Sequence, residues 1–225
     1  LWQDPAGKIR PMPQHGFARN SQFELRDANE TRLRTVLISD EKAKESYPYD
    51  YEFQVSYFFN ELGFLVELGL HNREEFPIPW SPGHHFYFTL PWHEGLGRDS
   101  YEINIPAKRA LRHLETGDLE PEAIDKQAGN AFDNPALVNR IHTHLTEEES
   151  TFGPKSGEER VAVRFKNSDP LPSSRSIVTW TEDDKSPFYC VEPWMGPPNS
   201  PVHRNGLQFV NSGESASFTV EVSLA

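Results

Sequence analysis

The fold is decided by residues 47–72, YPYDYEFQVSYFFNELGFLVELGLHN, where two strand-like segments flank a short turn. Apolar residues take every second position of the second segment: Phe64, Val66, Leu68 and Leu70. Such alternation is typical of a strand with one buried face. The turn, Asn60 to Gly63, is short and contains glycine, so the two strands are predicted to form an antiparallel hairpin.

Strand patterns recur on both sides of this hairpin, at residues 31–39, 100–106, 160–165, 176–181 and 188–192. A second hairpin is predicted at the end of the chain, joining 207–210 to 216–225. The rest of 91–135 is predicted to lack regular strands, and 146–160 to be a solvated acidic loop. Residues 136–145 fit either a strand or a short helix. Nine or more strands with almost no helix predict one all-β domain, residues 1–225, built as a large antiparallel β-sandwich or barrel.

Composition narrows the classes of partner. Hydrophobic residues make up 36% of the 225 residues, but aromatic residues make up 12%, so rings are expected to fill much of the core. The formal net charge is −12. Because nucleic acids and anionic membranes attract basic surfaces, neither is an expected partner. The charge does not exclude a small phosphorylated substrate, and the sequence predicts no particular oligomeric state.

Cys190 is the only cysteine, which excludes an intrachain disulfide framework and a cysteine-based metal cluster. A reducing compartment is the simplest expectation, so a cytoplasmic location is predicted. The chain has no apolar run of about 18 residues that would span a membrane. The first residues also lack the charged and then apolar pattern of a signal peptide.

Residues 186–201, SPFYCVEPWMGPPNSP, contain the first candidate for catalysis. The strand is predicted to stop at Pro193, which makes Glu192 its last pleated residue. Tyr189 and Trp194 flank this carboxylate, and shielding from water would raise its pKa towards a working range. The alternative is an ordinary exposed glutamate at the end of a strand.

A second candidate follows a proline-rich segment that ends at Gly83. After Gly83, alternation places His85, Tyr87 and Thr89 on one face of a strand. The alternative is that His85 is a packed histidine at a strand edge. A third polar cluster, HGFARN at residues 15–20, contains His15 and Arg19 beside a glycine that permits a tight turn.

Two other chemistries are less well supported by the sequence. His142 and His144, followed by Glu147–Glu149 and later by His203, resemble the ligand spacing of cupins, but the accompanying glycines are missing, so no metal is predicted. Cys190 lies within an apolar strand, and no G-x-S-x-G motif occurs, so covalent catalysis is not predicted either. Acid–base catalysis without a metal or covalent intermediate remains, and Glu192, His85, His15 and Arg19 supply the residue types that it needs. Aromatic residues suited to stacking on a sugar are Tyr87, Trp80 and Trp194.

Four motifs in order carry a resemblance to a known family: HGFARN (15–20), YPYDYEFQVSY (47–57), GHHFYF (83–88) and CVEPWMGPPN (190–199). Together they resemble the aldose 1-epimerase (galactose mutarotase-like) family, in its branch of mutarotase-related and glucose-6-phosphate 1-epimerase-like proteins. The resemblance implies a large antiparallel β-sandwich. It also implies an isomerase that interconverts the α and β anomers of an aldohexose or hexose phosphate without a cofactor.

The resemblance also implies roles for individual residues. Glu192 is the implied base that takes the proton of the anomeric hydroxyl, and His85 is the implied acid that protonates the ring oxygen. His15 and Arg19 are implied to hydrogen-bond the sugar.

The chain departs from the family pattern at three places. Phe86 follows His85 where many relatives have proline, and Pro135 takes the place of an aspartate that Asp133 is expected to replace. Family members have strands before the HGFARN segment, so the chain is expected to lack its first strands. These departures leave a second reading open, a carbohydrate-binding or sensing protein without turnover.

Overall fold

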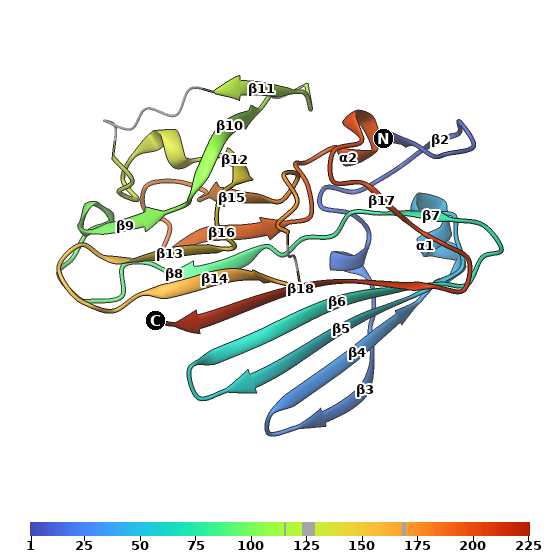
Figure 1. Ribbon diagram of the computed structural model, residues 1–225, viewed down its shortest axis with the longest axis horizontal. Coiled ribbons are helices and arrows are strands. Elements are labelled where there is room, and N and C mark those ends of the chain that lie inside the picture. The colour runs from blue at the N-terminus through green and yellow to red at the C-terminus, as the bar shows by residue number, and fades with distance from the viewer. Residues whose placement is uncertain (115, 123–128, 168–169) are drawn as a thin grey trace. The chain divides into compact units, whose positions relative to one another are not determined.

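The computed structural model describes residues 1–114, 116–122, 129–167 and 170–225. Most of its regular elements are β-strands, and paired strands run antiparallel (Figure 1). The chain divides into two compact units, Leu1–Ser81 with Asn199–Thr219, and Pro82–Pro198 with Val220–Ala225. The prediction of an all-β, antiparallel protein is confirmed, while that of a single domain over residues 1–225 stays a prediction. Among the described residues, no helix has the length and apolar character needed to span a bilayer.

Four consecutive strands form a ladder in the first unit: β3 (Glu24–Asn29), β4 (Arg32–Ile38), β5 (Tyr51–Asn60) and β6 (Gly63–Asn72). β5 and β6 pair along their whole length, with Tyr51 opposite Asn72 and Asn60 opposite Gly63. The predicted hairpin is therefore confirmed. Val66, Leu68 and Leu70 are all buried, as expected for alternate positions on one face of a strand.

The first unit also contains two short strand pairs and three short helices. β1 (Trp2–Gln3) pairs with β2 (Ile9–Arg10), and β7 (Ile78–Trp80) pairs with β17 (Gln208–Val210). The helices are η1 (Ala18–Asn20), α1 (Glu41–Ser46) and α2 (Ser200–His203). Asp40 caps α1 by accepting a 2.7 Å hydrogen bond from the backbone N–H of Ala43, which satisfies one of the free donors at the start of the helix.

The predicted closing hairpin is wrong, because β17 pairs with β7 and not with the last strand, β18 (Ser215–Leu224). Asn72, at the end of β6, explains the difference. Its buried side-chain amide donates to the carbonyl oxygens of Phe76 and Val210, at 2.8 and 2.9 Å. Its backbone N–H donates to Glu214 at 3.0 Å. These contacts hold the 211–214 turn against β6, so β17 is not free to fold back on β18.

The second unit contains a six-stranded antiparallel sheet in the order β11-β10-β12-β15-β16-β8. Its strands are β8 (Phe86–Thr89), β10 (Ala107–His113), β11 (Leu119–Glu122), β12 (Arg140–Leu145), β15 (Ser176–Trp180) and β16 (Phe188–Trp194). A second ladder joins β9 (Tyr101–Asn104), β13 (Glu149–Pro154) and β14 (Val161–Lys166). The helical turns η2 (Arg98–Ser100) and η3 (Pro135–Leu137) lie in the connections.

Aromatic rings join these two ladders. Phe88 of the sheet meets Phe152 of β13 at a ring-centroid distance of 4.8 Å, and Tyr189 meets Phe132 at 4.6 Å, both edge-on. Such edge-to-face pairs add to the stabilisation that burial of the rings supplies. Phe88 and Tyr189 are paired residues and share one face of the sheet. The opposite face of the same strands therefore carries the residues that alternate with them.

Two of the expectations for this unit were wrong. Residues 149–154 form β13 and not part of a solvated loop, because Phe152 is buried in the aromatic core and only the neighbouring residues carry the charge. Strands β10 and β11 likewise occupy part of the region expected to be irregular. The uncertain 136–145 segment contains a short helical turn, η3, followed by strand β12.

Candidate active site

Glu192 lies two positions further inside its strand than the sequence predicted, because β16 continues through Pro193 to Trp194. Pro193 lacks an N–H but still takes part in pairing, since its carbonyl oxygen accepts a 2.9 Å hydrogen bond from the N–H of His84. Val178 of β15 lies directly opposite Glu192. With a neighbouring strand on each side, the Glu192 residue is only 3% exposed.

His85 immediately precedes β8 and faces Glu192. The register pairs Phe86 with Val191, so the next position along brings His85 level with Glu192. The Nε2 atom of His85 lies 3.3 Å from Oε1 of Glu192, and the histidine side chain remains 23% exposed. His84 points the other way and stacks on Phe86, with ring centroids 4.8 Å apart. The predicted alternation of this segment is therefore confirmed.

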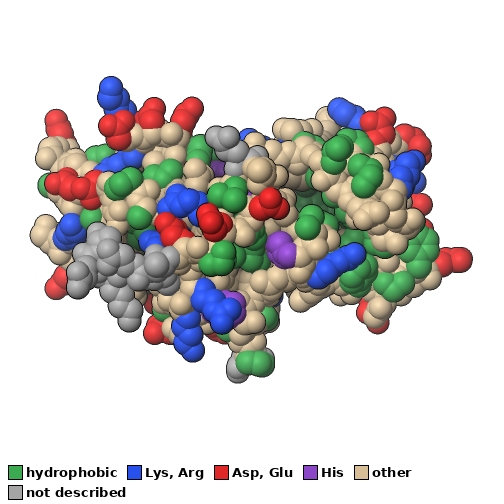
Figure 2. All heavy atoms as spheres, turned by 90° about the horizontal axis from the view of Figure 1, so that it is seen from above, with side chains coloured by type: hydrophobic (Ala, Val, Ile, Leu, Met, Phe, Trp, Pro, Cys, Tyr) green, Lys and Arg blue, Asp and Glu red, His purple; other side chains and the backbone are tan. Residues whose placement is uncertain are grey.

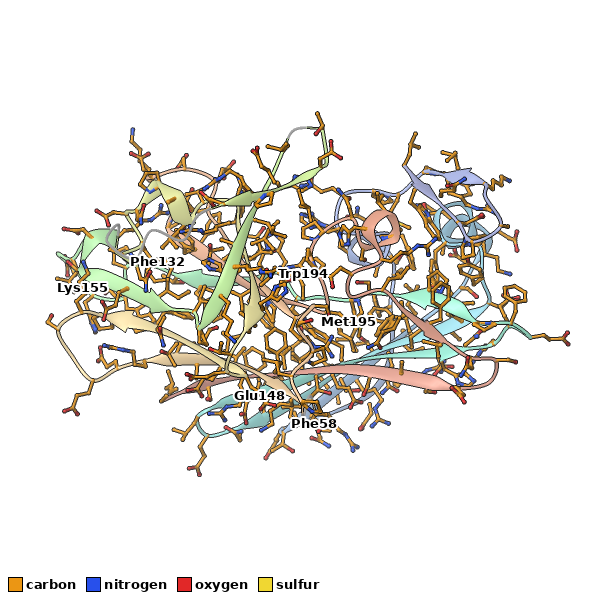
Figure 3. All side chains as sticks on the ribbon, turned by 45° about the horizontal axis from the view of Figure 1, so that its top comes forward. Phe58, Phe132, Glu148, Lys155, Trp194 and Met195 are labelled. Atoms are coloured by element: carbon orange, nitrogen blue, oxygen red, sulfur yellow. The ribbon has the colours of Figure 1, made fainter. Side chains whose placement is uncertain are left out.

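Trp194 holds the second carboxylate oxygen. Its indole N–H donates to Oε2 of Glu192 at 3.1 Å, and Figure 3 marks Trp194 and Met195 where β16 ends. Gly83 makes room for the indole, because a Cβ atom at position 83 would lie 2.0 Å from Cε3 of Trp194. The absence of a side chain at position 83 thus allows the ring to lie against the backbone and reach the carboxylate.

Burial raises the pKa of Glu192 to about 7, since an ionised carboxylate loses hydration when it leaves water. The hydrogen bond from Trp194 acts in the opposite direction, because it favours the ionised form. The direction of this pKa shift agrees with the shielded setting proposed from the sequence. A carboxylate that titrates near neutrality is able to accept and release a proton at the same pH.

Aromatic rings surround the pair. The imidazole of His85 stacks on the ring of Tyr87, with centroids 4.9 Å apart, and meets the ring of Trp180 edge-on at 5.7 Å. Phe188 contacts Tyr87 at 5.0 Å. Tyr87 is 54% exposed and presents a ring to solvent. Trp180 was not predicted as a site residue. Its position beside His85 and Glu192 depends on the pairing of β15 with β16, for which the sequence has no local signal.

Cys190 lies on the same face of β16, two residues before Glu192, and is fully buried. Burial, followed by the charge of Glu192, raises the pKa of the thiol to about 12. A thiol with this pKa holds its proton at neutral pH and is a poor nucleophile. This agrees with the choice of acid–base over covalent chemistry.

His15 and Arg19 lie in the first unit. His15 has a positive φ of 65°, and the N–H of Gly16 donates to Pro13, closing a turn before η1. Phe17 fixes the segment by stacking on Tyr47 with centroids 5.4 Å apart. Partial burial, followed by the charge of Arg19, lowers the pKa of His15. Their role as sugar ligands stays a prediction.

Asp133 is exposed in the turn before η3. The preceding residue, Phe132, packs on Tyr189, which lies on the face of β16 opposite Glu192. A sugar-binding role for Asp133 also stays a prediction.

The cupin-like set is not assembled within the described residues. His142 is buried, its Nε2 lies 3.3 Å from the hydroxyl oxygen of Thr179, and burial lowers its pKa to about 3. His144 instead lies 3.2 Å from the hydroxyl of Thr143. The one group of three potential metal ligands in the described ranges is His85, Cys190 and Glu192. The sequence pattern did not predict these three residues as a set, because they come together only through the pairing of β8 with β16.

The chain resembles known proteins in both sequence and structure. The chain is 25% identical over 193 residues to the chromosomal LacX protein of Lactococcus lactis subsp. lactis, a match that covers 81% of this chain and 62% of that protein. A galactose mutarotase related enzyme from Lactobacillus acidophilus superimposes with a TM-score of 0.81 at 19% identity, covering 97% of this chain and 76% of that one. The Slr1438 protein from Synechocystis sp. PCC 6803 gives a TM-score of 0.78 at 25% identity, with coverages of 99% and 73%.

These superpositions define the class: the chain has the fold of the galactose mutarotase-like proteins. The sequence profile for aldose 1-epimerase matches residues 2–223, and the chain belongs to the aldose 1-epimerase family. The predicted family and fold class are therefore confirmed. The chain spans less than two thirds of the length of its LacX relative.

Proposed function

We propose that this chain is a mutarotase that interconverts the α and β anomers of an aldohexose or a hexose phosphate. The observation that supports this most directly is a buried carboxylate with a pKa near 7 and an imidazole nitrogen 3.3 Å away. The anomeric hydroxyl oxygen and the ring oxygen of an aldose are bonded to the same carbon. Two proton-transfer groups this close together suit two such oxygens.

In the proposed reaction, the Glu192 carboxylate takes the proton of the anomeric hydroxyl while protonated His85 donates one to the ring oxygen. The C1–ring oxygen bond breaks and leaves the open-chain aldehyde. Rotation about C1–C2 presents the other face of the carbonyl. Closure with the two roles reversed then gives the other anomer and restores both protein groups. The exposed ring of Tyr87 and the indole of Trp194 are proposed to contact the sugar, with His15, Arg19 and Asp133 as further ligands.

The test is anomer exchange followed by NMR saturation transfer on glucose, galactose and glucose 6-phosphate. We expect a rate above the uncatalysed rate with at least one of them, and a loss of roughly 10²–10⁴-fold in Glu192→Gln, the contribution typical of a general base. Glu182→Gln is the matched control, because Glu182 is exposed on the β15–β16 connection. Full activity in Glu192→Gln would refute the assigned role.

A sugar-binding protein without turnover is the second candidate. The stacked pair of His85 and Tyr87, with Tyr87 largely exposed, provides a ring surface that suits sugar binding whether or not proton transfer follows. Calorimetric titration with the same sugars distinguishes the two. Heat of binding without anomer exchange would favour the second candidate.

A further inference from the structure

A third side chain with lone-pair chemistry meets the acid–base pair. The Sγ of Cys190, a ring nitrogen of His85 and a carboxylate oxygen of Glu192 all lie within 4.8 Å of one another. Cys190 and Glu192 alternate along β16, and His85 immediately precedes the neighbouring strand, β8. The cluster is therefore built from adjacent positions of a paired sheet and not from flexible surface residues.

Imidazole, thiolate and carboxylate are the three ligand types that bind Zn²⁺ in proteins, at about 2.0–2.3 Å. Two ligands of one tetrahedral ion at those lengths lie about 3.3–3.8 Å apart. The His85 nitrogen and the Glu192 oxygen, 3.3 Å apart, are already at this separation. Side-chain adjustments of about 1 Å are enough to bring in a sulfur within 4.8 Å.

The charge balance favours a divalent ion. A buried cation is costly unless anionic groups neutralise it. Glu192 supplies one negative charge, and Cys190 supplies a second when the metal takes the place of its thiol proton, which passes to solvent. Both residues are almost fully buried, so this cluster differs from the exposed acidic groups that commonly lie together without an ion. The sulfur ligand selects soft ions over Mg²⁺ and Ca²⁺.

We propose that His85, Cys190 and Glu192 bind one thiophilic divalent cation, such as Zn²⁺ or Cd²⁺, and that the bound ion inhibits the protein. The inhibitory part rests on the proposed function. The ion occupies the Glu192 oxygen and the His85 nitrogen that the reaction uses, so proton transfer stops. A sugar and the ion compete for the same two groups.

Cadmium titration tests binding without any need for turnover. Cadmium bound to thiolate gives a charge-transfer band in the ultraviolet, and Cys190 is the only cysteine, so the band reports on this position alone. We expect saturation at one equivalent of Cd²⁺ in the intact protein and no band in Cys190→Ser or Cys190→Ala. Affinity is expected to fall at least about tenfold in both His85→Gln and Glu192→Gln, because each removes one of three ligands.

The outcomes separate the two proposals. Unchanged cadmium affinity in His85→Gln and Glu192→Gln, or no band in folded wild-type protein, overturns the metal site whatever the activity. A band that depends on all three residues supports it even if no sugar is turned over. If anomer exchange is observed, Zn²⁺ must inhibit it, Mg²⁺ must not, and Cys190→Ala must resist Zn²⁺ at least about tenfold. Equal inhibition of wild type and Cys190→Ala overturns the inhibitory role.

Discussion

Glu192 couples the stability of the protein to pH through one buried carboxylate. Its pKa of about 7 in the folded chain lies above the ordinary value of 4.5. The folded state therefore binds more protons than the unfolded state between these two values. The contribution of Glu192 to stability is greatest below pH 4.5 and falls as pH rises through this window, because ionisation is harder in the folded state. A shift of this size corresponds to about 3 kcal/mol.

Glu192→Gln is expected to remove this loss of stability. The free energy of unfolding of the variant minus that of wild type is the quantity to compare. This difference should be up to about 3 kcal/mol larger at about pH 8 than at about pH 4. Denaturant unfolding at the two pH values measures the free energy of unfolding of each protein. Glu182→Gln, at an exposed position, should show no such pH-dependent gain. An equal difference at both pH values would contradict the burial of an ionisable group at 192.

The sequence predicted Glu192 and His85 as candidate residues better than it predicted that their side chains lie close together. Alternation predicted that His85 and Tyr87 share one face of the segment around β8, and Glu192, Cys190 and Phe188 take alternate positions of β16. The proximity of the two sets depends on β8 pairing with β16 across a gap of about a hundred residues, which no local pattern encodes. The four motifs of the family resemblance supplied that link.

Backbone contacts between the segment before β8 and the end of β16 orient the Glu192 carboxylate. Gly83 forms a bridge with Trp194, and the Met195 N–H donates to the Pro82 carbonyl at 2.9 Å. The indole lies where a side chain at position 83 would stand. Backbone pairing at this junction therefore positions the indole N–H of Trp194, which donates the hydrogen bond that Glu192 accepts.

Gly83→Ala is expected to displace the indole and remove its hydrogen bond to Glu192. Because this bond lowers the pKa of Glu192, its loss should raise that pKa further. A hydrogen bond to a charged group contributes about 1.5–3 kcal/mol, so the acid limb of kcat/KM for anomer exchange should move up by roughly one pH unit or more. The measurement is the pH profile of kcat/KM.

A second variant and a control accompany Gly83→Ala. Trp194→Phe removes the same donor without a clash and should shift the acid limb in the same direction. Gly69→Ala is the control, since a Cβ there would meet Gln54 at an ordinary 3.9 Å. A Gly83→Ala variant with lower activity and an unshifted acid limb would show that Trp194 does not tune Glu192.

Errors in predicting the elements share one physical cause. The sequence missed β13, because the acidic residues before Ser150 concealed a short segment whose Phe152 is buried by distant rings. The pairing of β17 with β18 was predicted wrongly, because the Asn72 side chain that prevents it lies over a hundred residues away in the sequence. The β5–β6 hairpin was predicted correctly, because a local turn joins its strands. Local pairing was predictable, and long-range pairing was not.

At the scale of the whole molecule, charge is the property that sequence alone determines. The formal net charge is −12, and the surface in Figure 2 shows acidic side chains scattered among basic and hydrophobic ones. An excess of one sign disfavours the compact state through self-repulsion. Ion pairs such as Arg164–Glu221, 3.0 Å apart, oppose this locally, but partly exposed pairs contribute little each.

Salt is therefore expected to stabilise the protein near neutral pH. Raising the ionic strength from about 0.01 M to about 0.15 M shortens the screening length from about 30 Å to about 8 Å. A gain of about 1 kcal/mol would raise Tm by about 2–4 °C in a chain of this length. Calorimetric scans at the two ionic strengths measure this shift. Near pH 5.2, the isoelectric point of the sequence, the effect should vanish, and a fall in Tm with salt at neutral pH would contradict it.

The contact between Gly83 and Trp194 limits which side chains these two positions can carry together. A side chain at position 83 and an indole at position 194 exclude one another, since both require the same space. Position 83 can therefore gain a side chain only where the indole at position 194 has been replaced or displaced. A lineage that exchanges the tryptophan for a smaller residue releases the glycine, whereas one that retains the tryptophan must inherit both. The two positions are more than a hundred residues apart in the chain, yet the residue at 194 limits what position 83 can hold.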